Sequence, residues 1–126
     1  MEQENGRYKH VDLRSVHQVG LDDFNREVLG EVRPVLLICL SKDPSFFSQL
    51  SEIEKIQSEY GRFLKVCLLE EGFLSVFMER YQVKGTPTFL IFSSGKEQER
   101  LLGRVNHQEL TRFILQTLPD LNPPVA

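Results

Sequence analysis

The sequence predicts an α/β fold, in which a mixed five-stranded sheet is flanked by four helices that lie on both of its faces. Three observations support this. Strand-like and helix-like segments alternate along most of the chain, as in folds built from right-handed crossovers. Two nearly continuous apolar runs, residues 34–40 and 63–70, have the composition of strands covered on both faces. The turn sequence SSGK at residues 93–96 separates two strand-like runs, which predicts an antiparallel hairpin.

The first three predicted elements are a strand, a helix and a second strand. Residues 15–19, SVHQV, have the composition of a strand. Residues 21–30, LDDFNREVLG, predict a helix, because its early acidic residues suit the helix dipole and Gly30 suits its end. The apolar run PVLLICL at residues 34–40 follows as the second strand.

The longest predicted helix comes next. Asp43 is a favourable N-cap residue, and Pro44 fits the first helical position, where its missing N–H costs nothing. The helix is expected to continue to Tyr60 and to end at Gly61. Its apolar face is predicted from the residues that recur at helical spacing: Phe46, Leu50, Ile53 and Ile56.

The second half of the chain begins with a buried strand at residues 63–70, FLKVCLLE, and a short helix at residues 73–81, FLSVFMERY. Two further strands, TFLIF at residues 88–92 and EQERLLG at residues 97–103, flank the predicted turn. These two strands form the antiparallel part of the sheet.

A final helix is predicted by a capping box, with Asn106 as the N-cap and Glu109 three residues later. Pro119 ends this helix. Its apolar face consists of Leu110, Phe113, Ile114 and Leu118.

The 126 residues fit one domain, expected at residues 11–120. Residues 1–10 and 121–126 are expected to be flexible, because they are polar or proline-rich and lack apolar periodicity. The polar N-terminus does not resemble a secretory signal, and the longest apolar run is too short to cross a bilayer. We therefore expect a cytoplasmic protein that does not associate with membranes.

Composition and charge argue against several kinds of site. The net charge is −3 and the basic residues are interspersed with acidic ones, so no nucleic-acid partner is expected. The three histidines, His10, His17 and His107, lack the spacing of metal ligands, so no metal site is expected. No glycine-rich phosphate loop occurs, and no cofactor is expected.

The segment YQVKGTPTFLIFSSGKEQERLLG, residues 81–103, together with the order of the elements resembles the thioredoxin family. The resemblance extends over residues 14–118, nearly the whole chain. It implies a thioredoxin-like fold in which Pro87 follows a cis peptide bond and a hairpin glycine lies beside the active site.

The resemblance also identifies a difference at the strand-to-helix junction, where thioredoxins carry Cys-x-x-Cys at a helix N-terminus that lowers the pKa of a thiol. The matching residues are Asp43–Phe46 or, one residue later, Pro44–Phe47, and neither segment contains a cysteine. Ser45 does not substitute, because a hydroxyl cannot replace a thiolate in disulfide exchange. No catalytic residue is therefore expected.

The resemblance further implies a buried Asp and a neighbouring Lys below the dithiol, and the matching residues are Ile38 and Cys67. If these two share a face of the sheet, Cys39 points to the opposite face and cannot pair with Cys67. Both cysteines lie in apolar segments, so we expect buried and unreactive thiols.

What the resemblance leaves in place is a groove beside the proline loop, where thioredoxins bind extended peptides through main-chain hydrogen bonds. We expect this groove to bind another protein or an extended peptide segment, with Phe46 or Phe47 in one wall. The residues expected to line it are Asp43, Pro44, Ser45, Phe46, Gly85, Thr86, Pro87, Leu102 and Gly103.

The predicted function is that of a redox-inactive thioredoxin-like protein that binds another protein, for example as a chaperone or assembly factor. The turn at Ser41–Pro44 also resembles a turn in some hydrogenase-maturation proteins of this fold that lack the dithiol. Two alternatives remain open at this point. One is an atypical thiol–disulfide oxidoreductase that uses Cys39 or Cys67, and the other is a structural subunit with a vestigial groove.

Overall fold

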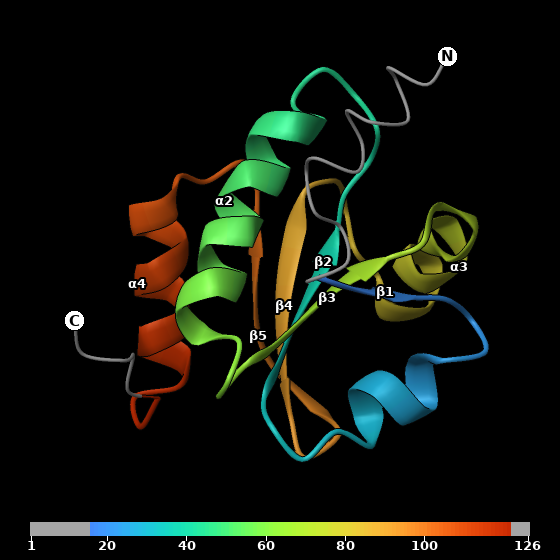
Figure 1. The fold of residues 1–126 in the computed structure, drawn as a ribbon. Helices are drawn as coiled ribbons and strands as arrows, with labels where there is room; N and C mark the ends of the chain where they lie inside the picture. Colours follow the sequence, from blue (N-terminus) through green and yellow to red (C-terminus); the bar gives the residue numbers. More distant parts are fainter. Residues whose placement is uncertain (1–15, 122–126) are drawn as a thin grey trace, which may run out of the picture.

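The computed structural model describes residues 16–121 and confirms the predicted fold class: a mixed five-stranded sheet with helices on both faces (Figure 1). The strands are β1 (His17–Val19), β2 (Val35–Cys39), β3 (Lys65–Leu69), β4 (Thr88–Ser93) and β5 (Lys96–Leu102). The helices are η2 (Asn25–Leu29), α2 (Phe46–Tyr60), α3 (Glu71–Tyr81) and α4 (His107–Thr117). The expected flexible residues 1–10 lie outside the described residues, as do all but Leu121 of the expected tail at 121–126.

The strands are arranged in the order β1-β3-β2-β4-β5. β3 is parallel to both β1 and β2, whereas β4 is antiparallel to β2 and to β5. The carboxyl end of β2 therefore lies beside the start of β4 and the end of β5. This edge of the sheet brings together segments that are far apart in the sequence.

A separate apolar core lies on each face of the sheet. α2 and α4 cover one face, where Leu36, Ile38 and Leu110 belong to one buried cluster (Figure 1). η2 and α3 cover the other face, where the Phe24 ring makes edge contacts with Phe73, Phe77, Tyr81 and Phe92 at centroid distances of 5.5–6.1 Å. Burial on both faces explains why β2 and β3 are continuous apolar runs in the sequence.

Two local predictions are confirmed in atomic detail. Ser93 pairs with Lys96 across the hairpin, and the two turn residues, Ser94 and Gly95, have positive φ angles of 53° and 78°. These angles match the two-residue turn whose twist suits an antiparallel hairpin. At the start of α4, the Asn106 side chain accepts the Glu109 N–H at 2.8 Å, while Glu109 accepts the Asn106 N–H at 3.0 Å.

The predicted helix over residues 21–30 is wrong in type and extent. The chain makes a turn after Gly20 and then forms only the five-residue π-helix η2, in which the Gly30 N–H reaches the Asn25 carbonyl at 2.8 Å. The other boundaries differ by less: β1 begins at His17, and α3 begins at Glu71, two residues before its predicted start.

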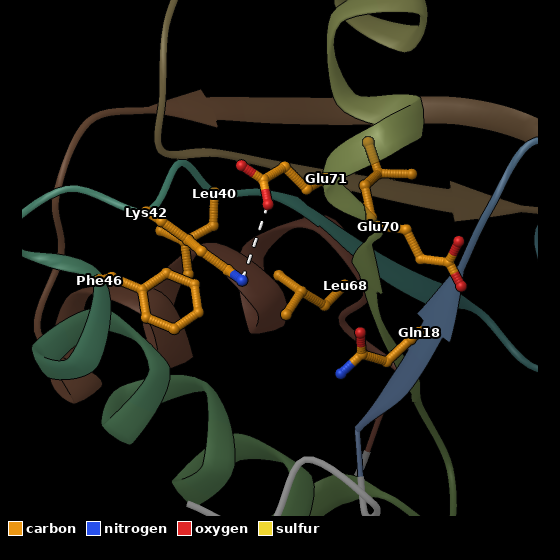
Figure 2. A pocket seen from close by; sticks show the side chains of 8 residues that line it. Gln18, Leu40, Lys42, Phe46, Leu68, Glu70 and Glu71 are labelled. Atoms are coloured by element: carbon orange, nitrogen blue, oxygen red, sulfur yellow. Dashed lines mark ion pairs between the residues drawn. The ribbon is translucent and has the colours of Figure 1, made fainter. Parts of the chain in front are cut away.

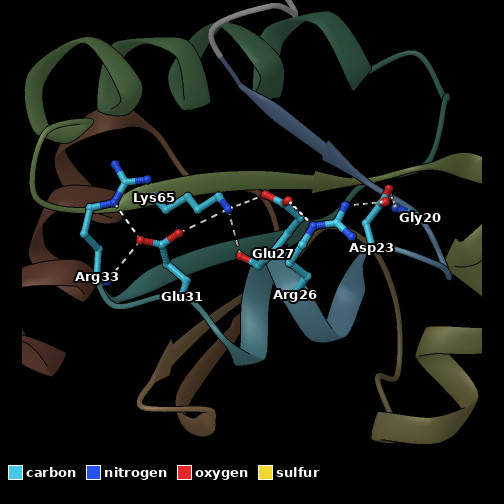
Figure 3. A network of polar contacts seen from close by, with 7 residues as sticks. All are labelled: Gly20, Asp23, Arg26, Glu27, Glu31, Arg33 and Lys65. Carbon is cyan, nitrogen blue, oxygen red and sulfur yellow. Dashed lines mark hydrogen bonds and ion pairs between the residues drawn. The ribbon is translucent and has the colours of Figure 1, made fainter.

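A network of charges explains why this polar segment folds as it does (Figure 3). The Lys65 side chain, only 5% exposed, donates to the Glu27 backbone carbonyl at 2.9 Å and pairs with the carboxylates of Glu27 at 2.6 Å and Glu31 at 3.2 Å. Arg33 donates to the other oxygen of Glu31 at 2.9 Å, and Arg26 to the other oxygen of Glu27 at 2.9 Å. Tertiary contacts, not helical periodicity, therefore hold η2 on the sheet.

The pKa values of this network follow from its contacts. Burial lowers the pKa of Lys65, but hydrogen bonds to Glu27 and Glu31 outweigh that effect and raise it overall. The hydrogen bond from the Arg33 side chain is the largest cause that lowers the pKa of Glu31 from 4.5 to about 2. Lys65 is thus held charged and the Glu31 carboxylate ionised at neutral pH.

No helix within residues 16–121 is long and apolar enough to cross a membrane.

We predict that Glu31→Gln lowers the free energy of unfolding at pH 7 by about 1–3 kcal/mol, since it removes charge-assisted hydrogen bonds to a buried lysine. The folded pKa of about 2 lies below the ordinary 4.5, so the ionised carboxylate stabilises the fold above pH 4.5 and this contribution is lost toward pH 2. Urea unfolding from pH 7 to pH 2.5 should therefore show the two proteins converging. A constant difference across this range, or an equal effect of the exposed control Glu79→Gln, contradicts the role given to Glu31.

Candidate functional site

The candidate site lies at the carboxyl edge of β2, where three segments meet. Cys39 at the end of β2 pairs with Thr88 at the start of β4, and Thr88 pairs with Leu102 at the end of β5. This register places the junction between β2 and α2, the loop at residues 85–87 and the end of β5 side by side. The sheet pairing therefore brings the three predicted segments together.

The loop before β4 is held by short contacts. The Thr86–Pro87 peptide bond is cis, and the Pro87 side chain is buried. The Thr88 hydroxyl donates to the Gly85 carbonyl at 2.6 Å, and the Gly103 N–H donates to the Pro87 carbonyl at 2.8 Å. Gly103 has a φ of 115°, a conformation that favours glycine over any other residue, so the hairpin end and the loop fit together only with this backbone.

A side-chain contact joins this loop to the junction after β2. The Ser41 hydroxyl lies 2.8 Å from the Thr86 hydroxyl, within hydrogen-bond distance. The main-chain N–H and C=O of Thr86 have no hydrogen-bond partner among residues 16–121. Both groups are therefore available to an added strand.

The prediction that Asp43 is the N-cap of α2, with Pro44 at its first position, is wrong. α2 begins at Phe46, and Ser45 occupies the cap position without a side-chain cap bond. Asp43 instead forms a turn just before the helix, where one carboxylate oxygen accepts the Ser45 N–H at 2.8 Å and the Ser45 hydroxyl at 2.7 Å. These bonds lower the pKa of Asp43, and the positive charge of Arg104 adds to the effect. The carboxylate thus organises the turn, as such residues do in short polar loops.

The two phenylalanines at the start of α2 have different environments. Phe46 is buried in the core under α2, whereas 42% of Phe47 is exposed, since adjacent helical residues cannot share a face. The Phe47 ring packs edge-on against Phe46 at 5.2 Å. The structure therefore favours Phe47 over Phe46 as the aromatic residue on the surface. On the other side of the loop, Leu102 is 56% exposed.

Sequence reasoning missed Gln49, a buried polar residue of α2. Its side-chain amide donates to the Val105 carbonyl at 2.8 Å and accepts the Val105 N–H at 3.0 Å. Gln49 thereby fixes the chain that follows Leu102 and Gly103 against α2. Its position among apolar helix residues was the one available signal, because a buried amide needs partners.

The condition that Ile38 and Cys67 share a face of the sheet is not met, since Ile38 and Cys67 belong to the buried clusters on opposite faces. Leu68 is the β3 residue beside Ile38, while Cys67 lies beside Leu37. Cys39 and Cys67 belong to the same buried cluster, on the face covered by η2 and α3. They are offset by two residues on adjacent strands, which places their Cα atoms about 8 Å apart, beyond disulfide range.

Both thiols are fully buried and unpaired. Burial raises the pKa of Cys39 to about 12, with a smaller opposing effect from Arg100. Burial likewise raises the pKa of Cys67 to about 12, with a smaller opposing effect from Lys65. Raised pKa values of this size disfavour the thiolate that disulfide exchange requires at neutral pH.

A small cavity of about 140 Å³ opens between Phe46 and the ends of β1 and β3 (Figure 2). Lys42 and Glu71 approach each other across it at 3.7 Å. This volume is below the roughly 300–1,000 Å³ of typical small-molecule sites. No three side chains among His, Cys, Asp and Glu in residues 16–121 are grouped to hold a metal ion.

The Ser41–Thr86 contact gives a testable stability prediction. Removing either hydroxyl, by Ser41→Ala or Thr86→Val, should lower the free energy of unfolding, and a double-mutant cycle should give a coupling energy of about 0.5–1.5 kcal/mol. Strictly additive effects in urea unfolding would mean that the two hydroxyls do not interact.

Burial of the thiols predicts their reactivity. In the native protein both cysteines should react with dithionitrobenzoate only as fast as the chain unfolds, because access and thiolate formation are both blocked. In 6 M guanidinium the two thiols of the chain should react at once. Rapid labelling of either cysteine without denaturant contradicts the buried positions.

Comparison with known proteins gives one informative similarity. No protein-family model matches the chain. The chain is 28% identical over 94 residues to a thioredoxin from Acidithiobacillus ferridurans. The aligned region covers 74% of this chain and 87% of that thioredoxin. Taken with the strand order and the helices on both faces, this similarity shows a chain with a thioredoxin-like fold and a distant relationship to thioredoxin.

Proposed function

We propose that this protein binds an extended segment of another protein in the groove beside residues 85–87, without thiol–disulfide chemistry. A role as a chaperone or assembly factor is consistent with such binding. The observation that carries the proposal is the main chain of Thr86, which has no hydrogen-bond partner among residues 16–121 and lies in a loop that other hydrogen bonds hold in place.

The main chain of Thr86 supports binding by strand addition. An extended peptide that runs past the loop gains hydrogen bonds from the Thr86 N–H and C=O, a mode that needs no cysteine. The loop is anchored by Ser41 and Gly103, so little ordering cost accompanies binding. Preorganised main-chain groups of this kind favour peptides of varied sequence.

Two exposed apolar side chains support the same position. Leu102 borders the loop on the β5 side. Its side chain lies close to Gly85, because a β-carbon added to Gly85 would be 3.7 Å from it. Phe47 lies at the start of α2, on the side of the β2 junction. An extended segment with apolar side chains buries surface on both of them.

The chemistry of the junction supports the absence of redox activity. The residues between β2 and α2 include two serines and an aspartate but no thiol. The two cysteines of the chain are buried with pKa values raised to about 12 by burial, on the face of the sheet opposite α2. A redox role for Cys39 or Cys67 requires the core under η2 and α3 to open.

An insulin-reduction assay separates binding from redox catalysis. With dithiothreitol as the electron donor, the protein should not accelerate insulin precipitation beyond dithiothreitol alone. An acceleration that disappears in the Cys39→Ala/Cys67→Ala variant would establish the oxidoreductase alternative and overturn this part of the proposal.

Binding can be measured by amide chemical-shift changes on adding S-alkylated insulin B chain, an extended probe without thiols. We expect the changes at residues 45–47, 85–87 and 102–103. Thr86→Pro should abolish them, because it removes the main-chain donor, whereas Thr86→Val keeps the donor and should retain binding.

A matched pair of variants tests the apolar wall. Phe47→Ala should weaken binding, while Phe63→Ala should not, since Phe63 has a similar exposed fraction (43% against 42%) but lies beyond the other end of α2. Shift changes confined to other residues, or no binding at millimolar probe, would support the structural subunit with a vestigial groove.

A further inference from the structure

We propose that the groove between β5 and α4 binds an acidic, extended segment of a partner protein, as a continuation of the site at Thr86. The inference rests on the proposed function, because the groove begins at Leu102, which also borders the 85–87 loop. It goes further by naming the path of the segment and the charge of its side chains.

The groove is large enough and apolar enough to accept a peptide. Its volume is about 370 Å³, and its lining includes Leu101, Leu102, Val105 and Phe113. Apart from the exposed Leu102, these side chains are half-buried and pack against the core under α2 and α4. Side chains of a bound segment would therefore rest on apolar surface that the fold already fixes.

The groove also includes the backbone edge of β5. Leu101 and Leu102 are consecutive strand residues and point to opposite faces of the sheet, so a groove that contacts both must pass over the strand edge. Among the strands within residues 16–121, β5 is the last of the sheet and pairs with β4 alone. Its outer main-chain groups are thus positioned to pair with an added strand.

Two arginines give the groove its charge preference. The side chains of Arg104 and Arg112 line it and are exposed, and neither forms an ion pair with a residue in 16–121, although the charge of Arg104 also acts on Asp43. The one acidic residue in the lining is Glu109, which accepts the Asn106 N–H in the capping box of α4, so the lining carries two positive charges and one negative charge. The groove is therefore locally positive on a chain whose net charge is −3.

The occupant that fits is an extended segment in which apolar and acidic residues alternate. The apolar side chains of such a segment would lie on the apolar part of the lining, and its carboxylates would pair with the two exposed arginines. A basic segment is disfavoured by the same charges.

The test uses two capped ten-residue peptides, one of alternating valine and glutamate and the other of alternating valine and lysine. The dissociation constant of the glutamate peptide should be at least about tenfold lower, since each exposed charge pair contributes modestly and two are involved. Its amide shift changes should fall at residues 101–105 and 109–116, and raising the salt should weaken its binding.

Charge reversal provides the matched control. Arg104→Glu/Arg112→Glu should reverse the preference, so that the lysine peptide binds more tightly. Arg62→Glu/Arg80→Glu alters the net charge equally at two exposed arginines away from the groove and should preserve the preference. Circular dichroism and urea unfolding establish that all variants fold.

The outcomes separate this inference from the proposed function. Equal affinity for both peptides, shift changes away from the groove, or an equal loss in the Arg62/Arg80 control overturns the inference. If the alkylated insulin B chain still binds at residues 85–87 in that case, the proposed function stands alone. If neither the insulin chain nor the peptides bind at millimolar concentration, both fail.

Discussion

The antiparallel pairing of β2 with β4 is the constraint on which the rest of the structure depends. It places Cys39 opposite Thr88 and thereby brings Ser41, two residues further on, within 2.8 Å of Thr86. The β4–β5 pairing then adds Leu102 at the same edge. A one-residue slip in the first pairing would turn the buried side chains of β4 to the wrong faces and separate the site's segments. The apolar cores on both faces prevent such a slip.

The charged network around Lys65 and the proposed binding site around Thr86 lie at opposite ends of the sheet. At the start of β3, Lys65 joins η2 to the sheet through Glu27 and Glu31, and Arg33 ties this network to the Gly61 carbonyl at 2.9 Å. At the other end, the loop around Thr86 and the groove along α4 carry unpartnered polar groups and exposed apolar side chains. This separation allows substitutions in the proposed binding site to alter affinity while leaving the charged network intact.

Much of the fold could be predicted from sequence because its signals are local. Continuous apolar runs predicted β2 and β3, the turn sequence predicted the β4–β5 hairpin, and a capping box predicted the start of α4. The π-helix η2 could not be predicted, since Lys65, 38 residues from Glu27, holds it. The face on which Cys67 lies could not be predicted either. Both faces of β3 are buried, so its sequence shows no alternation of apolar and polar residues that would identify the two faces. Of the site, the 85–87 loop was predictable from its motif, but Gln49 and the β5–α4 groove were not.

The proposed function requires that the main chain of Thr86, beside the proline loop of a thioredoxin-like fold, recognises a partner without a thiol taking part. Hydrogen exchange of the Thr86 amide, measured in the free protein and at saturation with S-alkylated insulin B chain, tests this most directly. We expect rapid exchange in the free protein and strong protection in the complex, in Thr86→Val as in the wild type. Unchanged exchange at Thr86, with protection appearing elsewhere, would contradict it.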